Sequence, residues 1–193
     1  MRRSFSYLTA LALCASVPLA GCGGDGGGGG SQETSLSGVA ATGAPIAGEV
    51  CGVDRDGDDL GCVAVAADGT FTLPTTGARG PILVGAFPSG GGQNQYSYAA
   101  ERDGVVNINP FTTLSLLLAT DYANLDTWFD TWAQVAREVD EDVLADAADA
   151  VLDHFAAQLT GAVAGGFDPF RSSFATDGTG FDGVLDARQR TEP

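Results

Sequence analysis

The sequence predicts a mixed α+β protein, in which an all-β sandwich of about seven strands (residues 36–109) precedes a small all-α region (residues 110–190). Two observations carry this prediction. Up to Asn109, short apolar or alternating runs recur at intervals near ten residues and are separated by turn residues, which is typical of a sandwich. Beyond Asn109 the apolar period changes from two to between three and four, the period of amphipathic helices.

The expected strands lie in seven segments, which are SLSGVAA, GAPIAGEVCGV, LGCVAVAA, TFTL, PILVGAF, QYSYAA and GVVNIN. An Asp68-Gly69 turn precedes TFTL, and the loop PSGGG follows PILVGAF. Because side chains alternate between the two faces of a strand, a period of two selects the residues that face the core. The predicted core residues are Val50, Val63, Val65, Phe71, Leu73, Leu83 and Tyr96.

The helical region begins after Asn109, which suits an N-cap, because Pro110 follows at the first helical position. A second helix is expected from Asp126 to Val139, with Trp128 and Trp132 on its apolar side. The third is expected from residue 141 to 163, and it is strongly amphipathic. Its apolar side holds Leu144, Ala148, Val151, Phe155 and Leu159, and its opposite, solvated side holds Asp142, Asp146, Asp149 and Asp153. A short last helix is expected to be capped by Asp182.

Residues 1–21 have the order of a secretory signal peptide, with Arg2 and Arg3 before an apolar stretch that is too short for a membrane span. The residues Leu19-Ala20-Gly21 before Cys22 match the lipobox, so the segment resembles a bacterial lipoprotein signal. That resemblance implies cleavage before Cys22 and acyl chains on this residue, which would hold the protein stably on a membrane. An ordinary signal peptide or a cytosolic start is the alternative.

Residues 22–35, the lipidated Cys and a glycine-rich tether, cannot bury enough apolar surface to fold. We expect a flexible tether that spans on the order of 20 Å. In lipoproteins of bacteria with two membranes, an Asp directly after the lipidated Cys retains the protein at the inner membrane. Gly23 stands there instead, so the resemblance implies an outer-membrane anchor, with the protein facing the periplasm or the cell surface.

The charge balance limits the partners. Without residues 1–21, seven arginines oppose 25 acidic residues, and the chain has no lysine. Basic groups are needed to neutralise phosphates, so this surface repels nucleic acid and anionic lipid. We therefore expect no nucleic-acid partner. The expected partners are the membrane, through the N-terminal lipid, and an envelope protein or glycan.

Two cysteines are left to pair, because Cys14 leaves with the signal and Cys22 is lipidated. We expect a disulfide between Cys51 and Cys62, since exported compartments are oxidising. Pairing them across a hairpin places Val53 opposite Leu60 and leaves residues 56–57, Asp-Gly, as a two-residue type I′ turn. A redox-active pair is the alternative, but the spacing is not Cys-x-x-Cys.

The tip of this hairpin, DRDGDD, places Asp54, Asp56 and Asp58 at alternate positions, as in calcium-binding loops. The twelve-residue calcium pattern then fails, because its sixth position is Asp59 where Gly is required, and its twelfth is Val65 where Glu belongs. The pattern favours a solvated acidic turn. Calcium binding by Asp54, Asp56, Asp58 and Asp59 is the alternative, and no other cofactor is expected.

Two further resemblances bear on function. SGVAATGAPIAGEV followed by ADGTFTL resembles the start of carboxypeptidase regulatory-like domains, of the form G-x-V-x-D-x-x-G-x-P-I-x-G-A-x-V and then D-G-x-F-x-L. It implies a transthyretin-like, immunoglobulin-like sandwich and a noncatalytic module of exported proteins, although Ala40-Ala41 and the cysteine pair depart from the family form. NPFTTL, GFDPF and FATDGTGFDGVLD resemble the helical region of uncharacterised proteobacterial lipoproteins, which usually continue into further β structure. That implies a short or altered C-terminus here.

Enzymatic chemistry is not expected, and no catalytic residue is assigned. His154 and Asp153 are adjacent on a helix, so they cannot point together as a base and its orienting group. There is no Gly-x-Ser-x-Gly, and one histidine with two bonded cysteines cannot build a zinc site. Paired carboxylates for glycoside hydrolysis stay open.

The expected function is therefore a lipid-anchored, noncatalytic binding or structural module of the cell envelope. It would present loops 54–59 and 88–94 to its partner. The alternative is a calcium-dependent or hydrolytic envelope factor that acts through the acidic loops 54–59 and 177–182. Docking of a partner through Trp128 and Trp132 is a third possibility, although aromatic residues at helical spacing usually belong to the core.

Overall fold

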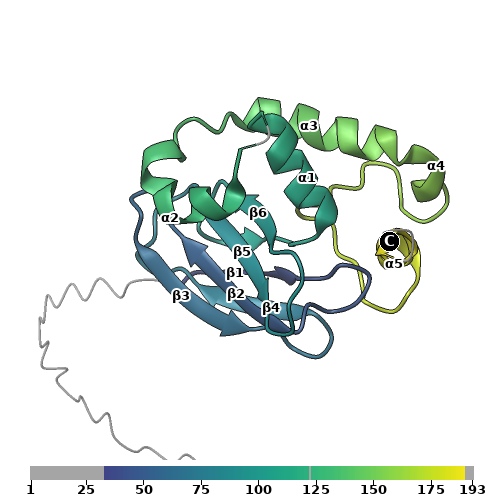
Figure 1. Ribbon diagram of the computed structural model, residues 1–193, viewed down its shortest axis with the longest axis horizontal. Helices are drawn as coiled ribbons and strands as arrows, with labels where there is room; N and C mark the ends of the chain where they lie inside the picture. The colour runs from purple at the N-terminus through teal and green to yellow at the C-terminus, as the bar shows by residue number, and fades with distance from the viewer. Residues whose placement is uncertain (1–32, 122, 190–193) are drawn as a thin grey trace, which may run out of the picture. The chain divides into compact units, whose positions relative to one another are not determined.

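A computed structural model describes residues 33–121 and 123–189, which belong to one compact unit (Figure 1). The predicted signal peptide, the lipidated Cys22 and most of the tether lie outside the described residues, so these features remain predictions. Across the described residues, strands in two sheets and several helices make a mixed α+β fold, as the sequence predicts.

Seven strands lie in the described residues, close to the seven predicted segments. The first sheet has the order β4-β1-β7, and the second has the order β3-β2-β5-β6. Neighbouring strands are antiparallel except β1 and β7, which are parallel. The bounds are β1 (Ser35–Val39), β2 (Gly48–Val53), β3 (Asp59–Ala64), β4 (Thr70–Pro74), β5 (Ile82–Pro88), β6 (Gln95–Ala99) and β7 (Gly104–Val105).

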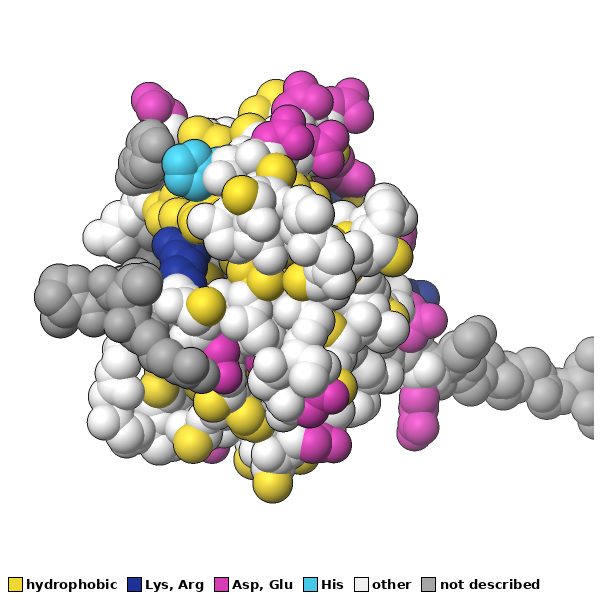
Figure 2. Space-filling view, turned by 90° about the vertical axis from the view of Figure 1, so that its right-hand side faces the viewer, with side chains coloured by type: hydrophobic (Ala, Val, Ile, Leu, Met, Phe, Trp, Pro, Cys, Tyr) yellow, Lys and Arg dark blue, Asp and Glu magenta, His cyan; other side chains and the backbone are white. Residues whose placement is uncertain are grey.

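Five helices follow in the described residues, which are α1 (Pro110–Ala119), α2 (Leu125–Val135), α3 (Glu141–His154), α4 (Ala156–Leu159) and α5 (Gly180–Gln189). The predicted cap of α1 is confirmed, because the Asn109 side chain accepts hydrogen bonds from the backbone N–H groups of Phe111 and Thr112. The four aspartates predicted to be solvated on the third helix are exposed. Acidic side chains gather along the upper edge of the molecule in Figure 2, the edge that α3 occupies in Figure 1.

Three predicted helix bounds are wrong. The second helix ends at Val135 rather than Val139, and it is kinked at Thr131, whose φ of −118° is not helical. The third helix ends at His154, because the chain leaves helical geometry at Phe155, and α4 is a separate short helix. The last helix begins at Gly180, so Asp182 lies in its first turn and is not the N-cap.

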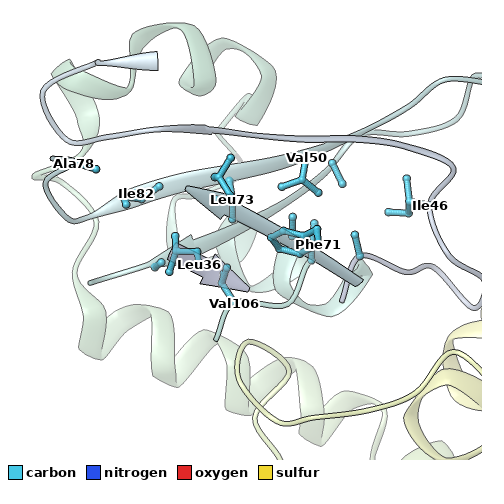
Figure 3. Close-up of a cluster of buried hydrophobic side chains, with 13 residues drawn as sticks. Leu36, Ile46, Val50, Phe71, Leu73, Ala78, Ile82 and Val106 are labelled. Atoms are coloured by element: carbon cyan, nitrogen blue, oxygen red, sulfur yellow. The ribbon is translucent and has the colours of Figure 1, made fainter. Parts of the chain in front are cut away.

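Side chains of both sheets meet in one hydrophobic cluster (Figure 3). Leu36 and Phe71 come from the first sheet, and Val50 and Ile82 come from the second; each is at most 5% exposed. The predicted core residues Val50, Phe71 and Leu73 are confirmed in this cluster. Val63 and Val65 are partly buried and pack against it.

Helices α1 and α2 cover the opposite face of the second sheet, and α3 packs against α1 (Figure 1). Leu83 and Tyr96 are buried there against Leu116 and Trp132, so the prediction that they are buried is confirmed. They face the helices rather than the first sheet. Strand β5 is thus covered on both faces, which explains its continuous apolar run.

Candidate functional site

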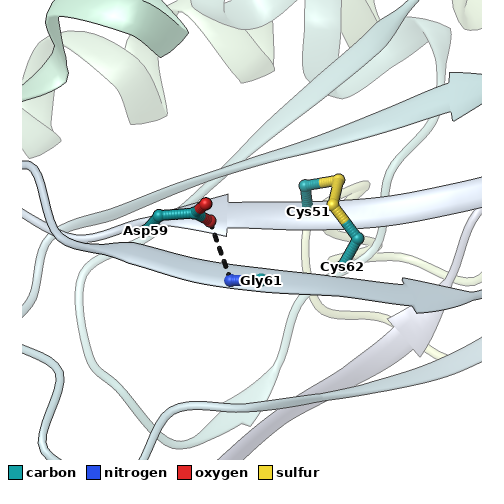
Figure 4. The surroundings of a disulfide bond; sticks show 4 residues. All are labelled: Cys51, Asp59, Gly61 and Cys62. Carbon is teal, nitrogen blue, oxygen red and sulfur yellow. Dashed lines mark hydrogen bonds between the residues drawn. A yellow bond between two sulfur atoms is a disulfide. The ribbon is translucent and has the colours of Figure 1, made fainter.

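The acidic hairpin tip is a tight turn whose register differs from the predicted one. Cys51 pairs with Cys62 as expected, and the two form a disulfide. Val53, however, pairs with Asp59 rather than Leu60, because Gly61 adopts a φ of +77° and the strand bulges. The Gly61 N–H donates to Asp59 Oδ1 over 2.8 Å beside the disulfide (Figure 4).

The predicted two-residue turn is also wrong. The Gly57 N–H donates to Asp54 O, and the Asp54 N–H donates to Asp58 O. Gly57 has a φ of +87°. This is the three-residue loop in which a type I turn ends in a left-handed glycine. The predicted two-residue turn is therefore replaced by a three-residue loop that ends at Gly57 and a bulge at Gly61, and both glycines have positive φ.

Asp54 is 2% exposed, and both of its carboxylate oxygens accept backbone hydrogen bonds. Oδ1 accepts from the Asp56 N–H at 2.9 Å and from the Asp58 N–H at 3.1 Å. Oδ2 accepts from the Arg79 N–H at 2.9 Å, so Asp54 also joins the hairpin to the segment before β5. Its observed role is to hold the turn, because its oxygens satisfy backbone donors that would otherwise be unpaired.

The four predicted calcium ligands are thus not brought together around one point. Asp56 forms an ion pair with Arg79 Nη1 at 3.0 Å, and Asp58 and Asp59 are exposed. In the part of the chain that the structure describes, no group of three or more His, Cys, Asp or Glu side chains is placed to hold a metal ion.

The second acidic loop, residues 177–182, has a buried carboxyl group. Asp182 is 1% exposed; its Oδ2 accepts from the Gly178 N–H, and its Oδ1 has no hydrogen-bond partner among the described residues. Burial raises the pKa of Asp182, and repulsion by Asp186 and Asp177 adds to this. Hydrogen bonds from Thr179 lower the pKa of Asp177.

The other residues considered for function, His154, Trp128 and Trp132, pack against neighbouring side chains. His154 is exposed at the end of α3 beside the ring of Phe155, 4.9 Å between centroids. Trp132 is fully buried, and its Nε1 donates to Pro81 O at 3.1 Å. Trp128 is partly buried and packs 6.1 Å from Trp132, centroid to centroid. The core interpretation of Trp132 is confirmed, so it offers no docking surface.

Loop 88–94, the second predicted binding loop, lines a cleft of about 520 Å³. The cleft lies between this loop, residues 42–47, the start of α1 and the end of α5. Its polar lining is mostly uncharged, and it includes Thr42, Gln93, Asn94, Gln95 and Thr113, with Arg188 at one end.

The amide and hydroxyl groups of this cleft are held in place. Thr113 Oγ1 donates to Gln95 Oε1 over 2.9 Å, and Asn94 Nδ2 donates to Asp126 Oδ1 over 2.8 Å. Arg188 lies 5.0 Å from the centroid of the Phe155 ring. Among the described lining residues there is no Asp, Glu, His or Cys. Such a lining can hydrogen-bond an uncharged polar ligand.

A second groove, with a volume of about 460 Å³, lies between α3 and residues 166–171. The sequence patterns do not predict it. Tyr98 on β6 also lines it. Its walls come from segments far apart in the sequence, so no local pattern could have indicated it.

None of the helices among the described residues combines the length and the apolar character that crossing a membrane requires. Comparisons with protein-family models, with curated proteins and with solved structures find no match to this chain. The resemblances to carboxypeptidase regulatory-like domains and to bacterial lipoproteins therefore remain predictions.

Proposed function

We propose that this protein is a noncatalytic binding or structural module of the bacterial cell envelope, anchored to the outer membrane by a lipid on Cys22. The Cys51–Cys62 disulfide is the observation that carries the proposal, because such bonds persist in exported proteins and are rare in the cytosol. The lipobox before Cys22 supports the anchor. Residues 23–35 would then separate the folded part from the lipid headgroups.

The proposed architecture of the β part is a transthyretin-like sandwich. The cluster shared by the two sheets supports it, since Leu36 and Phe71 from one sheet contact the same core as Val50 and Ile82 from the other. A sandwich leaves its loops free at two ends, where binding residues commonly lie on a rigid scaffold. Loop 88–94 is such a loop.

The proposed ligand of the 520 Å³ cleft is an uncharged polar segment of an envelope protein or glycan. The exposed amide of Gln93 supplies donors and an acceptor without a charge that must be desolvated, and the hydrogen bond between Thr113 and Gln95 fixes the wall beside it. Polar groups of this kind, placed at a few points in a cleft, fix the orientation of a ligand.

Two experiments test the proposal. In a bacterial host, the wild-type chain is expected in the outer-membrane fraction and the Cys22→Ser chain in the soluble periplasmic fraction; equal distribution of the two would contradict the anchor. For the cleft, a photo-crosslinking residue is placed at Gln93, which lines it, or at Ser89, an exposed position of the same loop outside it. A discrete product from position 93 alone is expected, and identical products from both positions would contradict the binding role.

A further inference from the structure

The groove beside α3 has one apolar wall made by a single helix face. Leu144, Ala145, Ala148 and Leu152 line it, at the spacings of three and four residues that share one side of a helix. Asp142 and Asp149, which the sequence places on the solvated side, also line the groove and are exposed. Asp146 and Asp153 are exposed on the same helix but do not line the groove.

The facing wall is a turn, residues 166–171, that two buried asparagines hold against the β part. Asn109 Nδ2 donates to Pro169 O at 3.0 Å, and Asn107 Nδ2 donates to Ser172 O at 2.8 Å. The Asn107 N–H also donates to Phe170 O at 2.7 Å. The wall is therefore held by hydrogen bonds before any ligand arrives, which lowers the entropic cost of binding.

The charge of the groove is strongly one-sided. Its lining includes four acidic residues, Glu141, Asp142, Asp149 and Asp168, and one basic residue, Arg171. Phe167 and Phe170 also line the groove and add apolar surface to it. A ligand that fits this lining has an apolar group for the floor and positive charge for the rim.

Tyr98 is a second, independent indication that the groove binds a ligand. The residue is 6% exposed, and it lines the groove from β6. Its hydroxyl makes no hydrogen bond to any described residue. Burial, and to a smaller extent the charge of Glu141, raise the pKa of Tyr98 to about 12, while Arg171 acts in the opposite direction. A protonated hydroxyl is thus available as a donor or acceptor for a ligand.

We propose that this groove binds a short peptide segment of a partner protein in which lysine or arginine flanks an apolar side chain. The apolar side chain would lie on the Leu144, Leu152 and Phe170 surface, and the cationic groups would lie near Asp142 and Asp149. The Tyr98 hydroxyl would accept or donate a hydrogen bond to the segment. This inference depends on neither the lipid anchor nor the cleft at loop 88–94.

The test mixes the full chain, with Cys22→Ser, with each of three blocked peptides. Binding is measured by isothermal titration calorimetry and by NMR of the labelled protein. The peptides are acetyl-Lys-Phe-Lys-amide, its charge-reversed form acetyl-Glu-Phe-Glu-amide and its apolar-deleted form acetyl-Lys-Ser-Lys-amide. We expect only the first to bind, with shift changes at Tyr98 and residues 166–171. Equal binding of the serine peptide, or no binding of the first peptide at millimolar concentration, would overturn the proposal.

Three variants locate the site. Tyr98→Phe is expected to weaken binding of the first peptide by about three- to tenfold, the loss of one hydrogen bond, with an unchanged melting temperature. Asp142→Asn with Asp149→Asn is expected to weaken it by about fivefold or more, from the loss of two rim charges. The matched pair Asp146→Asn with Asp153→Asn removes the same charge outside the groove, and we expect less than about a twofold change. Equal losses from both pairs, or unaltered binding by Tyr98→Phe, would show that the groove is not the site.

Discussion

Asn109 holds two separate parts of the chain, and the Asn109→Asp substitution separates its two roles. The side chain is fully buried, and its Oδ1 accepts from the N–H groups of Phe111 at 2.9 Å and Thr112 at 3.1 Å. These bonds cap α1. Its Nδ2 donates to Pro169 O at 3.0 Å, sixty residues away in sequence. An aspartate keeps the capping oxygen and loses the donor.

The two roles predict different losses of stability. If Asn109 were only an N-cap, Asn109→Asp would leave the free energy of unfolding nearly unchanged, because Asn and Asp cap helices about equally. In the structure, a second oxygen would face the Pro169 carbonyl in a site without solvent. Leaving that carbonyl unpaired costs about 1–3 kcal/mol, and burying a carboxylate adds to the cost. We expect a loss of at least about 3 kcal/mol at pH 7.

The loss is measured by urea unfolding, followed by tryptophan fluorescence, at pH 7 and pH 4. Burial raises the folded-state pKa of the introduced carboxyl above its unfolded value, so the charge cost grows as the pH rises through that range and is smaller at pH 4. The control is Asn124→Asp, since Asn124 is exposed and caps α2 with one hydrogen bond, to the Thr127 N–H. We expect less than about 0.5 kcal/mol for the control. Equal losses in the free energy of unfolding from Asn109→Asp and Asn124→Asp would refute the second role of Asn109, its bond to Pro169 O.

The other predictions concern single contacts. Replacing Cys51 and Cys62 by alanine opens a loop with a sequence separation of 11. We expect this to cost roughly 2 to 3 kcal/mol of stability on the chain-entropy model, or about 5 to 10 °C in melting temperature. A reductant should lower the melting temperature of the wild type by the same amount and leave that of the variant unchanged. Hydrogen bonds from Tyr96, then Asn94, lower the pKa of Asp126. The stability that they contribute is present above the unfolded pKa and is lost as the pH falls through the folded pKa, so Tyr96→Phe should flatten the stability profile in acid, and an unchanged profile would contradict the contact. The folded-state pKa of Asp182 is raised, so the stability that Asp182 contributes is present below its unfolded-state pKa and is lost as the pH rises through the folded-state pKa. Asp182→Asn should therefore raise the melting temperature at pH 7 but not near pH 3. Millimolar calcium should leave the wild-type melting temperature unchanged, because both oxygens of Asp54 already accept backbone N–H groups; a rise would favour the calcium-dependent alternative.

Local patterns predicted the elements well where local chemistry decides them. The turn residues between strands are Gly, Pro, Asn and Asp, whose backbone preferences act within a few residues, and the seven predicted segments correspond to β1–β7. The start of α1 was predicted because Asn109 and Pro110 act on the same helical turn. The disulfide followed from the count of available cysteines.

Long-range contacts account for the errors. At the hairpin turn, Asp54 accepts from the Arg79 N–H, which belongs to a segment 25 residues away that the hairpin sequence alone does not indicate. The third helix breaks at Phe155, whose ring packs 5.0 Å from that of Phe111, centroid to centroid. A period of two could not assign Leu83 to the face beneath the helices, because β5 is apolar on both sides.

The candidate sites are also built partly by local sequence and partly by long-range contacts. Loop 88–94 was predicted as a loop that the sandwich presents to a partner, and it does line a cleft, but the other walls of that cleft come from residues 42–47, α1 and α5. The groove at Tyr98 brings together β6, α3 and residues 166–171. Its acidic rim was visible in the sequence only as a solvated helix face, because the turn opposite it, residues 166–171, is held in place by Asn107 and Asn109.

The proposed envelope role is tested most directly by the intact mass of the protein purified from a bacterial host that lipidates its own lipoproteins. The account predicts a chain that begins at Cys22 and carries the added mass of a diacylglycerol and one further acyl chain. A soluble chain that retains residues 1–21, or one that carries no lipid at Cys22, would contradict it.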